Sequence, residues 1–509
     1  MLDPLPRVAA GSRLLLAGAA TTLIAGCTVG PDFQRPAGPP VDGYTAEPLP
    51  AQTAAAEVAA GEAQRFVREL DIPGQWWTLF HSAELDRLIE QALAANPNLS
   101  AAQAALRQAR ENVYAGEGAY FPTVTANGSA TREKSSGAAL GLPFSSTFGL
   151  TTAALNISYN PDVFGGTRRQ IESLKAQEDY QRYQLEATYL SLTANLVVAA
   201  VNEASLRGQI AATDDVVAIE TDSLRVLQNQ FELGGASKVA VLAQAATLAQ
   251  TRATLPPLQK QLAQQRNQLA ALIGAYPSQD RGEPFHLADL QLPRDLPVSL
   301  PSQLIEQRPD VRSAEAQLHT ASANIGVALA NELPQFNITG SLGNDALGFA
   351  KMFSPGTGVW SIAGSVAQTL FDGGTLLHRE RAAVAAFDQS TDLYRATVIS
   401  AVQDVANALR ALEADADAVN AQAAAVQTAF DSLDISRQQF QTGAITYLSL
   451  LTSQQTYQQS RIALVQAQAN RFSDTAALFQ ALGGGWWHRT DVAATVAGAD
   501  RIALPIPTR

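Results

Sequence analysis

The chain of 509 residues carries the same short motifs twice, in the same order. The run Leu88–Gln91 recurs as Leu304–Gln307, and Gln230–Gly234 has its counterpart in Gln439–Gly443. The copies lie roughly 210 residues apart, too long a period for a solenoid module, which implies two-fold pseudo-symmetry within one protomer. Because each copy contains both long helices and strands, few architectures remain.

Two long windows, 166–273 and 374–482, are dominated by the helix formers Ala, Gln, Leu, Glu and Arg. In each window we predict a first helix of about 67 residues, a rod of about 100 Å. A shorter helix then doubles back after Gly234 or Gly443, whose backbone tolerates the reversal. The apolar spacing, with small alanines on a second side, predicts coiled-coil pairs that close into a ring. A long soluble coiled coil is the alternative.

Four short segments, near 121–132, 150–160, 335–343 and 358–371, alternate apolar and small polar residues. This period of two is typical of a strand with lipid on one side and water on the other, although a half-buried soluble sheet would also alternate. Four strands cannot close a barrel, and an open sheet edge cannot face lipid. We therefore expect several copies to share one barrel, and three copies would supply twelve strands.

The N-terminus has the layout of a secretory signal peptide over residues 1–26. Arg7 and Arg13 precede a short apolar run, Leu14–Ile24, that is too short to span a bilayer as a helix. The next residues, Ala25-Gly26-Cys27, resemble a bacterial lipobox, which predicts a diacylglyceryl anchor and palmitate on Cys27. An export signal with an incidental cysteine is the alternative. Residues 27–74 are rich in Pro, Ala and Gly, so we expect an extended strap without a core of its own.

The composition excludes several classes of protein. A net charge of -12 without a basic stripe argues against a nucleic-acid partner. One cysteine and five histidines leave little material for a metal site, and no nucleophile–base grouping or phosphate-binding loop is present. We therefore expect no enzyme, no cofactor and no metal. Acidic residues such as Asp215 and Asp415 are interpreted as solvated helix faces or bore lining.

Several segments of the chain resemble those of a known protein family. The matching segments are Cys27–Phe33, Trp76–Leu93, Asn96-Pro97, Leu370–Gly374 and Ala481–Trp486, which span nearly all of the mature chain. The chain is similar to the TolC-like outer-membrane efflux proteins, and more closely to their NodT-type lipoprotein branch. By resemblance to lipoprotein sorting rules, Thr28 after the cysteine favours the outer membrane.

The resemblance implies an α+β membrane protein that works as a homotrimer. A twelve-stranded β-barrel, four strands from each protomer, would cross the outer membrane and continue into a long periplasmic α-helical barrel. The two repeats would occupy 75–275 and 299–486, joined by a linker at 276–298 and followed by a tail at 487–509. The implied partners are outer-membrane lipid, a periplasmic adaptor (membrane fusion) protein and an inner-membrane transporter of the RND type. The implied function is the exit duct for small toxic solutes such as drugs, with multidrug resistance as its consequence.

Site residues follow from the positions that match the family. The helical reversals match the periplasmic tips that contact the adaptor, although these residues can equally be turn formers: Gly234, Gly235, Ser237, Gly443, Ala444 and Thr446. The entrance constriction matches Leu448, Ser449, Thr452 and Gln455. Ser449 and Thr452 stand where relatives carry aspartate, so we expect a constriction of Leu448 and hydroxyls with weak cation block.

Three other functions remain open at this level. The same fold serves as the outer-membrane channel of type I protein secretion, against which the lipidated start argues. A structural envelope lipoprotein without conduction and an envelope enzyme are the others. For a duct, we expect the tips to be closed at rest and to splay about Gly234 and Gly443 when an adaptor binds.

Overall fold

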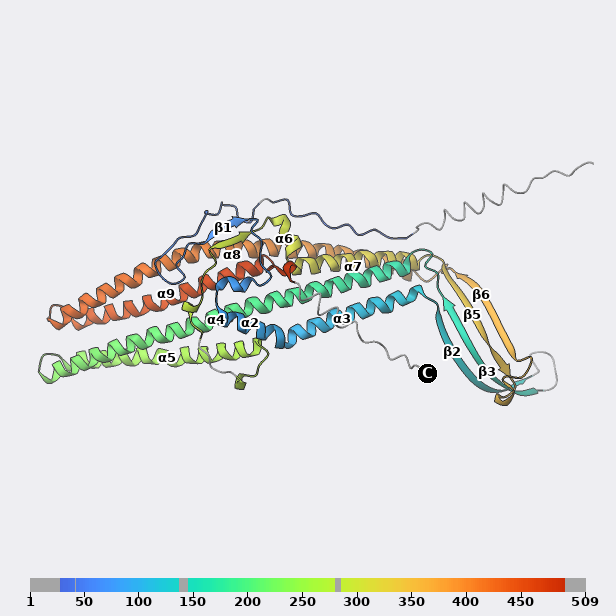
Figure 1. Ribbon diagram of the computed structural model, residues 1–509, viewed down its shortest axis with the longest axis horizontal. Coiled ribbons are helices and arrows are strands. Elements are labelled where there is room, and N and C mark those ends of the chain that lie inside the picture. Colours follow the sequence, from blue (N-terminus) through green and yellow to red (C-terminus); the bar gives the residue numbers. More distant parts are fainter. Residues whose placement is uncertain (1–27, 42, 137–144, 280–284, 490–509) are drawn as a thin grey trace, which may run out of the picture. The chain divides into compact units, whose positions relative to one another are not determined.

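The computed structural model describes residues 28–41, 43–136, 145–279 and 285–489. The predicted signal peptide 1–26, the predicted lipidation site Cys27 and most of the predicted tail 487–509 lie outside the described residues. The described chain forms two compact units, and each of the two predicted repeats contributes to both of them (Figure 1). Of the described residues, the first unit comprises those up to Arg35, Arg107–Tyr180 and Ala314–Tyr394, and the second comprises Pro36–Leu106, Gln181–Ser313 and those from Arg395 onward.

The first unit contains a four-stranded antiparallel sheet in the order β2-β3-β5-β6 (Figure 1). Its strands are β2 (Thr123–Ser136), β3 (Ser145–Tyr159), β5 (Gln335–Ala346) and β6 (Gly358–Ala367). They overlap the four predicted ranges. β2 and β3 remain paired as far as Ser136 and Ser145, beyond the predicted limits. The charged run Arg132–Lys134 interrupts the alternation there, so the pattern does not reveal this part of the hairpin.

The register of the sheet brings the apolar residues of all four strands onto one face. Leu155 of β3 lies opposite Leu342 of β5, which in turn lies opposite Trp360 of β6. The neighbouring row is polar, and the Ser341 and Ser361 hydroxyls lie 2.8 Å apart. In a single protomer the apolar row is open to solvent, since Trp360 is 76% exposed. This face therefore lacks the apolar environment for which its residues are suited.

The fourth strand ends at Ala367 rather than at the predicted residue 371, because Ala367 pairs with Gln335, the first residue of its partner strand β5. The Asp372 carboxylate accepts hydrogen bonds from the N–H groups of Gly374 and Leu376, at 2.8 Å each, and caps α8 (Thr375–Gln441). Asp162 caps α4 (Gly166–Glu232) in the same way. The first unit also contains four shorter elements: α3 (Pro97–Glu117), η2 (Gly118–Tyr120), α7 (Pro309–Asn331) and η6 (Phe349–Lys351). Of these, α3 and α7 begin in the second unit and continue into the first.

Two helical hairpins dominate the second unit (Figure 1). The first joins α4 to α5 (Lys238–Leu272) and the second joins α8 to α9 (Tyr447–Ala481). The long arms have 67 residues each and the returning arms 35 residues each. Within the described part of the chain, none of the helices carries an apolar stretch sufficient to cross a bilayer.

The base of each hairpin is tied to the loop that follows a short helix. Asn96, after α2 (Ala83–Ala95), donates from Nδ2 to the Leu272 carbonyl at 2.8 Å. Arg308, after α6 (Pro301–Gln307), donates to the Ala481 carbonyl at 3.3 Å. Glycines make these contacts possible, since a Cβ on Gly274 would lie 2.4 Å from the Ala95 carbonyl and one on Gly483 would lie 2.2 Å from the Gln307 carbonyl.

The core of the second unit is aromatic. In η1 (Trp76–Phe80), both Trp76 and Phe80 are fully buried. Trp76 stacks on Phe479 with 5.4 Å between ring centroids, and Phe80 packs near Phe472 at 6.2 Å. The family-like run of aromatic residues at this position is therefore a packing element.

The strap has more fixed structure than the sequence indicates. Its residues 65–68 form β1 (Arg65–Arg68), which pairs in parallel with β4 (Asp295–Val298) at the end of the predicted linker. Gln64 and Thr53 of the strap are buried because α9 holds the strap's polar side chains and carbonyls, so this burial comes from packing on another element and not from a core of the strap's own. The remaining short elements are η4 (Pro277–Gln279), η5 (Leu287–Asp289) and η7 (Trp486–His488).

Candidate functional site

Both hairpins reverse at a glycine in the left-handed region, Gly234 with φ of +77° and Gly443 with φ of +75°. In the first tip, the N–H of Gly235 donates to the Gln230 carbonyl at 2.7 Å. In the second tip, the N–H of Ala444 donates to the Gln439 carbonyl at 2.8 Å. These bonds close the last helical turn as in a Schellman motif, so the two tips have the same local structure.

A hydroxyl residue then starts each returning helix. The Ser237 hydroxyl accepts from the N–H of Ala240 at 3.2 Å, and the Thr446 hydroxyl accepts from the N–H of Ser449 at 3.4 Å. A Cβ on Gly234 or Gly443 would meet no atom within 4 Å, so these glycines serve the turn rather than a close approach. The predicted tip residues thus come together in two short exposed loops.

The predicted constriction residues share one face of α9. Leu448, Ser449, Thr452 and Gln455 are all exposed, Leu448 by 68%. Leu450, Gln454 and Tyr457 on the other side of the helix are buried. Within one protomer, the predicted constriction residues therefore form an exposed face of α9, opposite its buried side.

Three polar side chains on the buried side of α9 bind the first hairpin, and we call them the ladder. The Tyr447 hydroxyl donates to Gln244 of α5, Gln454 donates to the Ser223 hydroxyl at 2.9 Å, and Arg461 pairs with Asp215 at 3.2 Å. The α9 residues Tyr447, Gln454 and Arg461 are spaced by one heptad, which places them on one side of the helix. The sequence analysis did not predict these contacts. The seven-residue spacing of polar side chains on α9 was the signal that could have indicated them.

Glu220 of α4 lies beside the first contact of the ladder. Its carboxyl is fully buried and accepts one hydrogen bond, from the Thr251 hydroxyl at 3.1 Å. Burial raises the pKa of Glu220, and the hydrogen bond from Thr251 offsets this only in part. Burial, followed by the proximity of Glu220, also raises the pKa of Tyr447.

A second buried charge holds the strap to α9. Arg471 is fully buried and donates to the Ala60 carbonyl at 2.7 Å, the Glu62 carbonyl at 2.6 Å and the Thr53 hydroxyl at 3.0 Å. Next to it, Asp415 of α8 faces Asp474 of α9. Burial, together with the facing Asp474, raises the pKa of Asp415 to about 7. Asp415 is therefore not an ordinary solvated residue, in contrast to the interpretation from sequence.

This pair makes the stability of the fold depend on pH. A folded-state pKa above the ordinary value of 3.8 means that the folded chain binds the proton more tightly, so stability is highest at low pH and falls as pH rises toward about 7. We expect Asp415→Asn to flatten this fall, measured as the unfolding midpoint between about pH 5 and about pH 8. Asp417→Asn, at an exposed position on the same helix, is the control and should keep the wild-type dependence. Equal slopes for wild type and Asp415→Asn would contradict this account.

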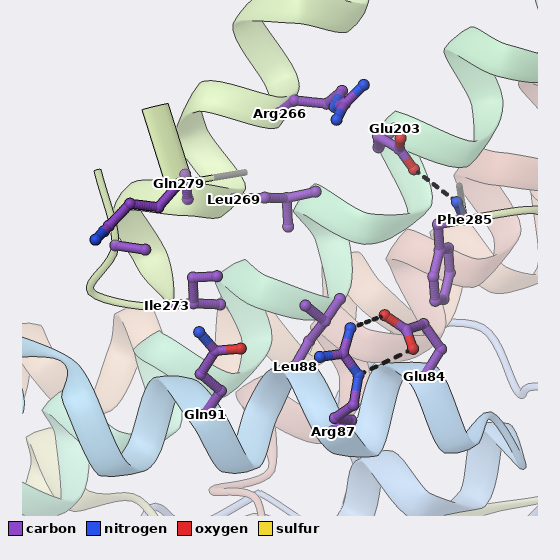
Figure 2. Close-up of a pocket in the computed structure, with 12 residues that line it drawn as sticks. Glu84, Arg87, Leu88, Gln91, Glu203, Arg266, Leu269, Ile273, Gln279 and Phe285 are labelled. Carbon is purple, nitrogen blue, oxygen red and sulfur yellow. Dashed lines mark hydrogen bonds and ion pairs between the residues drawn. The ribbon is translucent and has the colours of Figure 1, made fainter. Parts of the chain in front are cut away.

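A cavity of about 440 Å³ lies between α2, α4, α5 and the segment after α5 (Figure 2). Its polar lining is largely self-paired, since Arg87 binds Glu84 at 2.5 Å and Glu203 accepts the N–H of Phe285 at 3.2 Å. Burial raises the pKa of Glu203, while Arg207 at 2.6 Å opposes the shift. Among the described residues, no group of three His, Cys, Asp or Glu side chains could hold a metal ion. The paired charges of this cavity therefore link α2 to itself and α4 to the segment after α5.

Comparisons with known proteins agree on one group. The family model described as "Outer membrane efflux protein" matches residues 88–275 and 300–484, and each range contains one hairpin tip. The "Probable efflux pump outer membrane protein TtgC" of Pseudomonas putida is 27% identical over 488 residues, covering 94% of this chain and 97% of its own. The "Pyoverdine export outer membrane protein OpmQ" of Pseudomonas aeruginosa is 30% identical over 433 residues, covering 81% of this chain and 87% of its own.

The solved structures give the same answer. The outer-membrane channel OprN superposes with a TM-score of 0.82 at 27% identity, covering 90% of this chain and all of its own. Its likeness extends over both the sheet and the hairpins, because so little of either chain is left out.

Proposed function

Because this chain belongs to the outer membrane efflux protein family, we propose that it forms the duct through which small toxic solutes such as drugs leave the cell. It is an outer-membrane channel of an efflux pump, and it spans that membrane and extends into the periplasm. The observation that carries the proposal is the match of the family model to residues 88–275 and 300–484, which lie within the two predicted repeats. Family members are channels rather than enzymes, in line with the expectation from sequence.

The sheet supports a shared barrel. The solved relatives are trimeric channels with a helical barrel. Among the described strands, β2 and β6 each pair on one side only, and such edges cannot remain open in lipid. Three protomers would join these edges into a closed barrel of twelve strands, with the apolar row facing lipid. The equal lengths of the two hairpins support the internal two-fold repeat.

Channels of this family work with a periplasmic adaptor and an inner-membrane pump. For this chain we assign the adaptor contact to the exposed tips around Gly234 and Gly443, the RND type to the pump, and the lipid anchor to Cys27. The second tip's neighbouring face, from Leu448 to Gln455, would form the entrance constriction, since it is exposed in one protomer and its buried side is already occupied. Opening would separate α9 from the first hairpin by breaking the ladder.

The test of the duct is conductance together with drug sensitivity. Purified protein in planar bilayers should pass ionic current, and deletion should sensitise cells to antibiotics, dyes, detergents or metals. Protein that assembles but carries no current would instead be a structural envelope lipoprotein. A deletion strain that loses only a secreted protein would identify a type I secretion channel.

The constriction makes a separate prediction. Thr452→Asp should place a ring of carboxylates at the entrance and lower the half-blocking Mg²⁺ concentration by roughly tenfold, since a charge contact at about 4 Å is worth about 1 kcal/mol or more. Single-channel conductance against Mg²⁺ concentration measures it. Thr442→Asp, in the tip loop outside the predicted face, is the matched control and should leave the block unchanged. Equal Mg²⁺ block in wild type and Thr452→Asp would contradict the assignment of this face of α9 to the entrance constriction.

A further inference from the structure

Glu220 sits where three helices of the second unit meet, on α4 and against α5 and α9. It is fully buried in the single protomer. Assembly with other protomers can only bury it further, so its isolation from solvent does not depend on the oligomeric state. A carboxylate in such a place needs either a cationic partner or a proton.

Within the described part of the chain, burial and the hydrogen bond from Thr251 are the influences on the Glu220 carboxyl, and no cation is among them. One carboxyl oxygen accepts from Thr251, and the other, Oε2, has no hydrogen-bond partner within the described part of the chain. Arg252 of α5 donates to Thr221 at 3.4 Å instead. On α9 the facing titratable group is the Tyr447 phenol, which as an acid cannot neutralise a carboxylate.

The same carboxyl adjoins the first contact of the ladder. Gln244 donates from Nε2 to the Glu220 backbone carbonyl at 3.1 Å and accepts the Tyr447 hydroxyl through Oε1. Gln244 is fully buried as well. A negative charge on Glu220 would therefore appear inside the junction that joins α9 to the first hairpin.

We propose that Glu220 is a proton-binding residue of the periplasmic gate, whose neutral carboxyl holds α9 against the first hairpin and whose ionisation favours the open tip. The proposal rests on the proposed gating of this channel. When α9 separates, water reaches the carboxyl, and the proton passes from Glu220 to solvent. Opening thus releases a proton, and closing takes one up.

The direction of the effect follows from linkage. Burial raises the pKa of Glu220 in the closed state above its ordinary value of 4.5, whereas hydration in the open state restores it. Below pH 4.5, Glu220 is protonated in both the closed and the open state, so the open-to-closed ratio does not depend on pH. Above it the open state is increasingly favoured, by up to about tenfold in the open-to-closed ratio per pH unit for each protomer, until the closed-state pKa is passed.

The experiment records single-channel openings of the purified full chain in planar bilayers, with the periplasmic side varied from about pH 4.5 to about pH 8. Wild type should open more often as pH rises. Glu220→Gln, which keeps an acceptor for Thr251 but cannot ionise, should stay mostly closed and lose the pH dependence. Glu203→Gln is the matched control, since Glu203 is equally buried but has Arg207 as its partner and lies away from the ladder.

Each outcome is decisive. Equal pH dependence in wild type and Glu220→Gln, or its loss in Glu203→Gln alone, overturns the role of Glu220 while leaving the duct intact. Absence of current in every variant overturns the duct itself. Where Glu220→Gln does not assemble, Thr251→Val provides the second test. Loss of the Thr251 hydroxyl, which donates to Glu220, should raise the closed-state pKa further and extend the pH-dependent range of opening to higher pH.

Discussion

Joining the two hairpins through Ser223→Cys and Gln454→Cys should stop export almost completely while leaving the trimer assembled. The side chains at these positions are 2.9 Å apart, on α4 and α9. A covalent bridge here keeps the middle contact of the ladder closed, so α9 cannot leave the first hairpin when an adaptor binds. The measurement is dye efflux in a deletion strain carrying the variant, before and after oxidation or treatment with a short bifunctional thiol reagent.

The matched control joins two helices within one hairpin. Ser436→Cys and Ser453→Cys replace hydroxyls 2.9 Å apart on α8 and α9, so a bridge between them leaves the second hairpin free to move as a body. Export should continue after this bridge forms, and a reductant should restore export in the first variant. The sequence contains a single native cysteine, Cys27, which keeps the background low. Unimpaired export after complete bridging of Ser223→Cys to Gln454→Cys would refute the gate.

The largest loss of stability is expected at the hairpin bases, from Gly274→Ala and Gly483→Ala. Both glycines have positive φ, and a Cβ would lie within 2.4 Å of a backbone carbonyl oxygen that cannot move away without breaking the tie to α2 or α6. We expect each change to cost about 3 kcal/mol or more, through strain and displacement together. The readout is the temperature at which the folded channel loses its resistance to protease.

Gly234→Ala separates the two causes. Gly234 has nearly the same φ as Gly274, but a Cβ there would meet no atom within 4 Å. Only the left-handed conformation is then penalised, at about 1 kcal/mol. If Gly274→Ala proved as mild as Gly234→Ala, the close approach at the hairpin base would be of no consequence for stability.

Much of the architecture could be predicted because its signals are local. Alternation marked the strands, glycines marked the reversals, and strong helix formers marked the long arms. The errors lie where local signals conflict with their surroundings. The charged run Arg132–Lys134 concealed the end of the first strand pair, and the last strand ends early because its partner β5 begins at Gln335, the residue paired with Ala367. The sequence predicted an extended strap but not its attachment to α9, since nothing in the strap's composition shows that Arg471 donates hydrogen bonds to its carbonyls.

The candidate site was predictable only in part, for a related reason. The tips and the exposed face of α9 follow from their positions in the predicted repeat. The ladder does not, because Tyr447 and Gln244, or Gln454 and Ser223, meet only after two hairpins far apart in sequence are set in register. Glu220 looks like any other helical glutamate, and its burial arises from that same register. An Ala- and Gln-rich helix has no dominant apolar stripe from which the register could be deduced.

The strap's hold on α9 fixes how far that helix can travel. Gln468 donates to the Ala59 carbonyl at 2.8 Å, and about one turn later Arg471 donates hydrogen bonds to three acceptors of the strap. The strap therefore holds α9 in place from Gln468 onward. The part of α9 from Tyr447 to Gln468, about 30 Å long, remains able to move. A tilt of α9 at Gln468 would therefore move Leu448 much farther than it moves the residues next to Gln468. Such a tilt would widen the proposed entrance while the base of the hairpin stays in place.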